Sequence, residues 1–297
     1  GRIISGNMLI TGNGILRLES GSGLFAALTI GNYKTHGNSG LHTSILAGNN
    51  NQINGSFGVI LGGADNDCFS DYAVIGGQSC VGSGAANIVV VGGQNNTGAA
   101  LATVVVGGQR NAAQSAQSVV GGGVSNLILS ISTGAAIVGG LQNTITTANY
   151  SFAGAGEKNK INANYGIVVG GLANSGISTS TFQGGGEYNQ CGGSGAVVVG
   201  GLRNRTFDLG AVIIGGADNV SSGIFSITCA GSGNLVSGRD YSSSFSCILG
   251  GRNNRIDGAA CSIGGGSGNF ASGDCSAVLA GRGNICSGAN SIIGAGL

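Results

Sequence analysis

Hydrophobic and polar positions repeat along most of the chain in one short unit. Three apolar residues are followed by Gly-Gly, two variable residues and an asparagine, as from Ala211 to Asn219, and a looser half ending in small residues completes the unit. Most units are fifteen residues long, which is too short for a helix-turn-helix repeat or a propeller blade. The pattern predicts an all-β fold, a parallel β-solenoid of about sixteen coils, each with two short strands and two tight turns.

The apolar triplets are the predicted strands. Runs such as Val89-Val90-Val91 and Val104-Val105-Val106 are β-branched, which favours strand over helix. The chain contains no proline, and this suits a stacked solenoid in which each strand needs its backbone N–H for the next coil. The Gly-Gly-x-x-Asn stretch is the predicted first turn, because glycine and asparagine both tolerate the left-handed backbone region.

The asparagine of each unit is the main candidate site residue. Stacked side-chain amides about 4.8 Å apart are expected to form a structural ladder between coils. The competing hypothesis is a row of asparagines that binds sugar or an ion, although calcium needs an aspartate in each turn. Cys80 occupies the one vacant slot. The predicted ladder comprises Asn51, Asn66, Asn96, Asn111, Asn126, Asn143, Asn159, Asn174, Asn189, Asn204, Asn219, Asn234, Asn254, Asn269 and Asn284.

Continuous apolar triplets such as Val197-Val198-Val199 also predict association between chains. Side chains alternate between the two faces of a strand, so a run with no polar residue implies burial on both faces. One face would line the coil interior, and the other would form an apolar stripe on the order of 75 Å long. The expected partner is the chain itself, as a homotrimer or a filament.

The regular units span residues 44–297, and residues 1–43 form an irregular N-terminal cap or joint with degenerate coils near Leu28 to Asn32. The widest spacing, from Asn234 to Asn254, predicts an extruded loop and a candidate binding site at Arg239, Asp240 and Tyr241. Because residue 1 is glycine and Met8 is the sole methionine, a processed or excised chain is expected.

Charge and titratable groups argue against most other functions. Twelve Lys and Arg against eleven Asp and Glu provide no basic stripe for nucleic acid, and the short apolar runs predict no membrane insertion in this segment. Eight cysteines without metal-ligand spacing predict no metal site and no cofactor, although Cys261 and Cys275 lie about one coil apart as possible ladder neighbours. His36 and His42 lie in the irregular start, and no convergent catalytic set is evident, so no enzymatic activity is expected.

The unit Ala211-Val212-Ile213-Ile214-Gly215-Gly216-Ala217-Asp218-Asn219 resembles the head-domain repeats of trimeric autotransporter adhesins and related virus and phage fibre repeats. The resemblance covers roughly residues 44 to 297 as a repeat pattern. It implies a left-handed parallel β-roll, three chains around a shared apolar core, and display at a surface for attachment.

Two functional hypotheses follow. The chain is an adhesive fibre protein at a cell or virion surface, with a host-surface receptor or glycan as ligand, or it is a passive subunit of an extracellular filament. A virus or phage fibre that binds a host receptor is a further form of the first hypothesis. In a eukaryotic secretory pathway, sequons at Asn54, Asn95, Asn149, Asn204 and Asn219 become candidate glycosylation sites.

Overall fold

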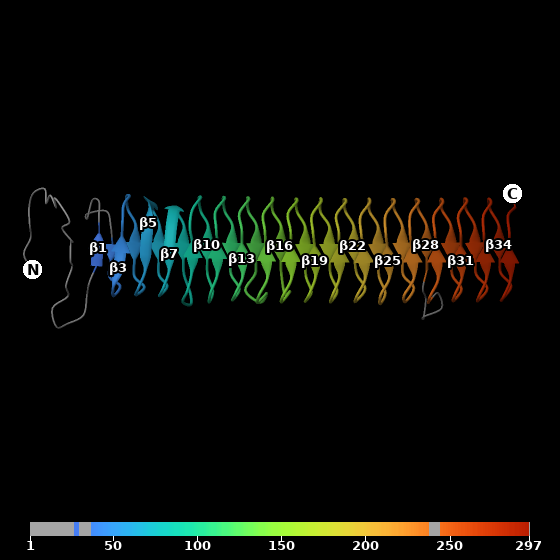
Figure 1. The fold of residues 1–297 in the computed structure, drawn as a ribbon, viewed down its shortest axis with the longest axis horizontal. Coiled ribbons are helices and arrows are strands. Elements are labelled where there is room, and N and C mark those ends of the chain that lie inside the picture. Colours follow the sequence, from blue (N-terminus) through green and yellow to red (C-terminus); the bar gives the residue numbers. More distant parts are fainter. Residues whose placement is uncertain (1–26, 30–36, 238–243, 297) are drawn as a thin grey trace, which may run out of the picture.

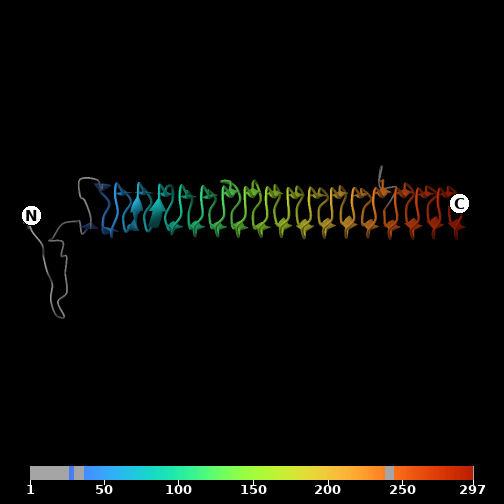
Figure 2. The same ribbon diagram turned by 90° about the horizontal axis from the view of Figure 1, so that it is seen from above.

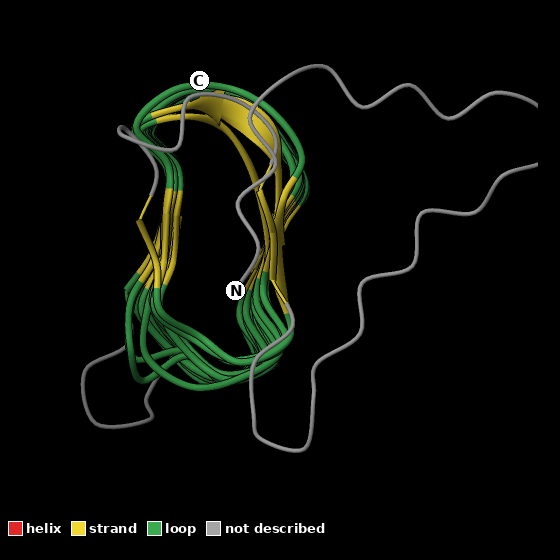
Figure 3. Cartoon of the chain, turned by 90° about the vertical axis from the view of Figure 1, so that its left-hand side faces the viewer, coloured by secondary structure: helices red, strands yellow, loops and turns green. Residues whose placement is uncertain are grey.

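A computed structural model describes residues 27–29, 37–237 and 244–296. The chain winds into a straight row of stacked coils (Figures 1 and 2), and each coil is a flattened loop with a strand on either long side (Figure 3). No helix is present in these ranges. The predicted all-β parallel solenoid of about sixteen coils is therefore confirmed.

The odd-numbered strands form one parallel sheet, here called sheet A, in which each strand pairs with the odd-numbered strand of the next coil. Its strands are β1 (Ala27–Thr29), β3 (Thr43–Ile45), β5 (Val59–Ala64), β7 (Val74–Gln78), β9 (Val89–Val90), β11 (Val104–Val105), β13 (Val119–Val120), β15 (Ala136–Ile137), β17 (Phe152–Ala153), β19 (Ile167–Val168), β21 (Phe182–Gln183), β23 (Val197–Val198), β25 (Val212–Ile213), β27 (Ile227–Thr228), β29 (Cys247–Ile248), β31 (Ser262–Ile263), β33 (Ala277–Val278) and β35 (Ile292–Ile293).

The even-numbered strands form the opposite parallel sheet, sheet B, on the other long side of the coil. Its strands are β2 (Gly37–Asn38), β4 (Gln52–Ile53), β6 (Asp67–Cys68), β8 (Val81–Gly82), β10 (Thr97–Gly98), β12 (Ala112–Ala113), β14 (Leu127–Ile128), β16 (Thr144–Ile145), β18 (Lys160–Ile161), β20 (Ser175–Gly176), β22 (Gln190–Cys191), β24 (Arg205–Thr206), β26 (Val220–Ser221), β28 (Leu235–Val236), β30 (Arg255–Ile256), β32 (Phe270–Ala271) and β34 (Ile285–Cys286).

The core is a narrow column between the two sheets. In β23 and its flanks, Ala196 and Val198 are buried whereas Val197 and Val199 point outward, so the apolar triplet still alternates in space. Opposing inward residues are complementary in size: the large Ile75 side chain occupies the space that a side chain on Gly82 would fill. Burial of aliphatic residues at most inward positions of sheet A, interrupted by Gln183 and Thr228, thus holds each coil to the next.

Three residues in a regular coil have left-handed backbone conformations. They are the second glycine of the Gly-Gly pair, as at Gly201 with φ 94°, the residue before the asparagine, as at Arg203 with φ 53°, and one residue at the second turn, as at Phe225 with φ 52°. The ladder asparagine is not among these residues, and its side chain points inward, where it makes the bonds described below.

The solenoid strands extend to the N-terminal side of residue 44. Strand β1 pairs with β3, with Ala27 opposite Thr43, and β2 pairs with β4, with Gly37 opposite Gln52. The proposed cap or joint otherwise falls largely on residues 1–26 and 30–36, which lie outside the described residues.

Candidate functional site

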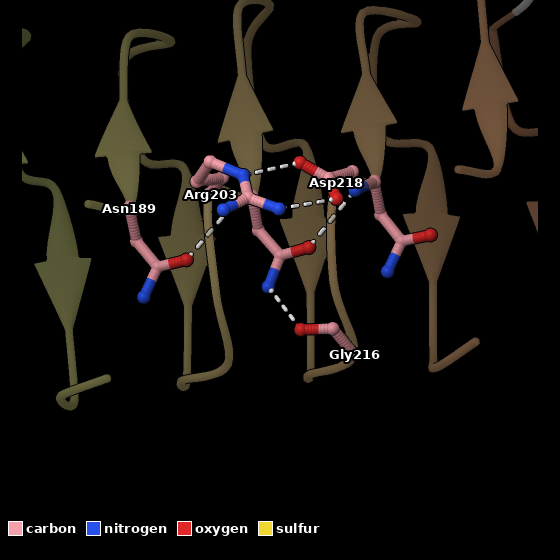
Figure 4. A network of polar contacts seen from close by, with 6 residues as sticks. Asn189, Arg203, Gly216 and Asp218 are labelled. Carbon is pink, nitrogen blue, oxygen red and sulfur yellow. Dashed lines mark hydrogen bonds and ion pairs between the residues drawn. The ribbon is translucent and has the colours of Figure 1, made fainter. Parts of the chain in front are cut away.

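The asparagines of the repeat form a buried ladder along the first turn. At Asn204, Oδ1 accepts the backbone N–H of Asn219 in the next coil at 3.0 Å. Nδ2 donates to Gly200 O in its own turn at 3.0 Å. It also donates to Gly216 O in the next coil at 3.0 Å (Figure 4). The ladder therefore joins each side chain mainly to the backbone of the next coil, and direct amide–amide bonds occur at a minority of steps, such as Asn66 to Asn51 at 3.0 Å.

This geometry bears on the hypothesis of a sugar- or ion-binding row. Fourteen of the fifteen predicted asparagines are at most 1% exposed, and Asn284 is half-buried. Both amide donors of a residue such as Asn204 already bind backbone carbonyls. Apart from Asn284, the ladder side chains therefore have no surface that a ligand in solution can contact.

Cys80 interrupts the ladder. Its backbone N–H still donates to Asn66 Oδ1 at 3.0 Å, but its thiol has only long contacts with carbonyls, among them Gly93 O at 3.7 Å. A thiol is a weak donor and acceptor, and burial raises the pKa of this one. One rung of the ladder is therefore weaker than its neighbours.

Replacing Cys80 with asparagine should raise the free energy of unfolding by about 1–2 kcal/mol. The new amide would accept the Asn96 N–H and donate to the glycine carbonyls around it, as at the other rungs. Urea denaturation followed by circular dichroism measures the gain, with Cys80→Ala as the control that removes the thiol without adding an amide. An asparagine variant no more stable than the alanine variant would contradict the prediction.

Charged side chains gather at the tips of the first turn, outside the ladder. The nine charged residues at the two variable positions are exposed or half-buried. Arg203 and Asp218 of adjacent coils form an ion pair at 2.6 Å (Figure 4). This hydrogen bond lowers the pKa of the Asp218 carboxyl below its usual range, and the pair stays exposed, so it contributes little to stability.

Aromatic residues stack at the second turn, a feature that the repeat pattern did not predict. Phe57 and Tyr72 of adjacent coils lie 4.8 Å apart and nearly parallel, and His42 extends the stack at 5.2 Å from Phe57. Tyr150 and Tyr165 form a second stack at 5.8 Å. All five have positive φ, so the same backbone conformation at each corner places their rings one above the other. His42 is part of this stack, and no acid lies beside it there.

The outer side of sheet A is the largest candidate interaction surface. We call it the apolar face and define it by the outward residues of each coil. None of these residues is charged, and only two are serines. They are Ser44, Leu46, Val59, Leu61, Val74, Gly76, Val89, Val91, Val104, Val106, Val119, Gly121, Ala136, Val138, Phe152, Gly154, Ile167, Val169, Phe182, Gly184, Val197, Val199, Val212, Ile214, Ile227, Cys229, Cys247, Leu249, Ser262, Gly264, Ala277, Leu279, Ile292 and Gly294.

The outer side of sheet B differs in composition. It carries charged residues at outward positions of β6, β18, β24 and β30, among them Lys160, Arg205 and Arg255. In the chain alone the apolar face is open, with Val199 47% exposed and Val169 46% exposed. The predicted burial of both strand faces therefore holds for the inner face, and burial of the outer one requires a partner.

The cysteines divide between the interior and the surface. Cys261 is buried and contacts Ser276 of the next coil, with Sγ and Oγ 3.4 Å apart, whereas Cys275 is exposed at the second turn. The suggestion that Cys261 and Cys275 are ladder neighbours was wrong, because they occupy different positions in the coil. Burial raises the pKa of the interior thiols Cys68 and Cys191 to about 11, which keeps them protonated.

The remaining candidate residues fall in three kinds of position. Asn54 and Asn95 are exposed and Asn149 is half-buried, whereas Asn204 and Asn219 are buried ladder members whose amides cannot accept a glycan in the folded chain. The candidate binding loop at Arg239, Asp240 and Tyr241 lies outside the described residues.

The described ranges contain neither a metal-ligand cluster nor a membrane-spanning helix. No group of three or more His, Cys, Asp or Glu residues there has the arrangement of a metal site. No helix there is long and apolar enough to cross a membrane. Comparison with known proteins found no matching family model and no matching curated protein.

Proposed function

We propose that this chain is a structural fibre subunit that associates with copies of itself through the apolar face. The supporting observation is the uninterrupted uncharged surface along sheet A. At about 4.8 Å per coil and about 10 Å in width, its area is on the order of 800 Å². This exceeds the largest apolar patch of a typical monomer, and it matches the area that each partner contributes to a standard interface.

The repeat favours a second copy as the partner. Outward side chains recur once per coil along the whole face, so a surface that packs against all of them must have the same spacing. Another chain of this sequence meets that condition in every coil. Trimeric closure and filament growth both bury the face, and they differ in whether association stops at a fixed number of chains.

The resemblance to the head repeats of trimeric autotransporter adhesins and of virus fibres favours display outside the cell or on a virion. In that setting the fibre would hold a receptor- or glycan-binding surface away from its anchor. A catalytic role has no support in the site, because the polar side chains of the ladder are fully occupied by structural bonds.

Association through the apolar face is tested with two matched double variants. Val169→Glu with Val199→Glu places two charges on the apolar face, and Ile177→Glu with Phe207→Glu places two charges on the outer side of sheet B in the same coils. Val199 and Phe207 are equally exposed, at 47%. Since each buried unpaired charge costs several kcal/mol, the first variant should weaken association at least about 100-fold.

Sedimentation velocity over a concentration series measures the effect. The unmodified chain should give species that are multiples of 28.7 kDa, discrete for a trimer and open-ended for a filament. The sheet B variant should behave like the unmodified chain. A monomeric unmodified chain, or equal weakening by both variants, would refute the proposal.

A further inference from the structure

Cys229 and Cys247 are the two cysteines of the apolar face. Cys229 directly follows β27 and Cys247 begins β29, and these strands are neighbours in sheet A, with Ile227 opposite Cys247. Both side chains are partly exposed. The other six cysteines either lie inside the coil or, in the case of Cys275, at the second turn.

The two cysteines lie on adjacent strands of the apolar face, two residues apart in register. Burial raises the pKa of the Cys247 thiol, and the electrostatic influence of the nearby Cys229 raises it further. No charged residue of the apolar face lies near them, since their neighbours there are Ile227, Leu249 and Ser262. The pair thus forms a compact, accessible dithiol on an otherwise unreactive surface.

A disulfide between these two residues within one chain does not fit the backbone. The pair is diagonal in the sheet, because Cys229 aligns with Leu249 and Cys247 with Ile227. Neighbouring strands are about 4.8 Å apart and two residues span about 6.6 Å, so the Cα atoms are ~8 Å apart. A disulfide needs Cα atoms within about 7 Å.

A second copy is not bound by this fixed spacing within one sheet, because its cysteines approach from across the apolar face. If two copies meet at their apolar faces in parallel and in register, each coil faces the same coil of the other chain. Along the fibre axis, the Cys229 thiol is then level with Cys229 of the second copy and one coil, about 4.8 Å, from its Cys247. A fully overlapped antiparallel pair would instead set Cys229 against the coil of Val104 and Val106, which contains no cysteine.

We propose that Cys229 and Cys247 form interchain disulfides that covalently lock parallel, in-register copies of this chain. The inference rests on the proposed association through the apolar face. Each bond joins one thiol from each chain, and a disulfide oxidant such as oxidised glutathione takes up the two electrons and two protons to give two reduced glutathione molecules.

The test is oxidation of the full chain with a glutathione redox buffer at mildly alkaline pH, followed by gel electrophoresis without reductant. Covalent multiples of 28.7 kDa should form. They should disappear in the double variant Cys229→Ser with Cys247→Ser. They should persist in Cys275→Ser, which removes the exposed thiol at the second turn.

Each other outcome overturns the inference. Loss of the covalent species in Cys275→Ser but not in the double variant would assign the bond to the second turn. Assemblies that sediment normally yet give no covalent species would refute the disulfide and leave the proposed function intact. A chain that stays monomeric in sedimentation at the same concentration would refute both.

Discussion

Gly201→Ala should destabilise the protein by at least about 3 kcal/mol, whereas Gly200→Ala, one residue earlier, should leave stability unchanged or raise it. Gly201 has φ 94°, and a Cβ there would lie 2.2 Å from Gly216 O of the next coil. Gly200 has no positive φ, and a Cβ there would meet no atom within 4 Å. Alanine at 200 therefore only restricts the unfolded chain.

The two substitutions lie at adjacent residues of the same turn, so each variant is the control for the other. Urea denaturation followed by circular dichroism gives both free energies of unfolding. The expected result is a difference in sign or a gap of several kcal/mol. Equal effects would mean that the coils are not spaced as closely at this turn as the backbone contact requires.

The period alone predicts the fold, because fifteen residues with a β-branched triplet and no proline leave few alternatives to a stacked coil. It does not distinguish the two glycines of each pair. Gly200 and Gly201 recur with identical spacing, and only the three-dimensional turn reveals that the second glycine carries the positive φ and the close carbonyl. The left-handed residue before the asparagine is equally invisible, since arginine, tyrosine and alanine all occupy that position.

The cysteines show how a small offset changes the position within a coil. Cys275 follows Cys261 by fourteen residues, and the true coil neighbour, Ser276, follows by fifteen. One residue moves a side chain from the interior to the second turn. Conversely, Cys229 and Cys247 are eighteen residues apart and lie on neighbouring strands only because the insertion between Asn234 and Asn254 lengthens that coil. The spacing in residues alone therefore does not show which two side chains are neighbours across an insertion.

The apolar face was predictable from the valine triplets, and association through it stays a prediction. The valine triplets require an outward aliphatic residue once or twice per coil, and the structure places these residues in two columns on sheet A. The sequence gives no comparable pattern for sheet B, whose outward positions mix charged, polar and aromatic residues. The two sides of the coil therefore differ in composition, and this difference favours the outer side of sheet A for the proposed association.

Asn204→Ala should lower the free energy of unfolding by about 2–4 kcal/mol, because it leaves one buried and one partly buried backbone group without their partners. The Asn219 N–H loses its acceptor and Gly200 O loses its donor. Gly216 O keeps one hydrogen bond, since it also accepts the Leu202 N–H at 2.9 Å. Asn204→Asp should be at least as damaging, because the isosteric carboxylate cannot donate to the two carbonyls and would be a buried charge.

The matched control is Arg203→Gln, in the same turn and adjacent in sequence. It removes the exposed ion pair with Asp218 and should cost at most about 1 kcal/mol. Hydrogen exchange locates the effect, because the Asn219 amide should lose protection in Asn204→Ala and retain it in Arg203→Gln. If the alanine variant unfolds at the same urea concentration as the arginine variant, the buried ladder does not hold adjacent coils together, and the coil spacing must rest on the strand pairs and the aliphatic column alone.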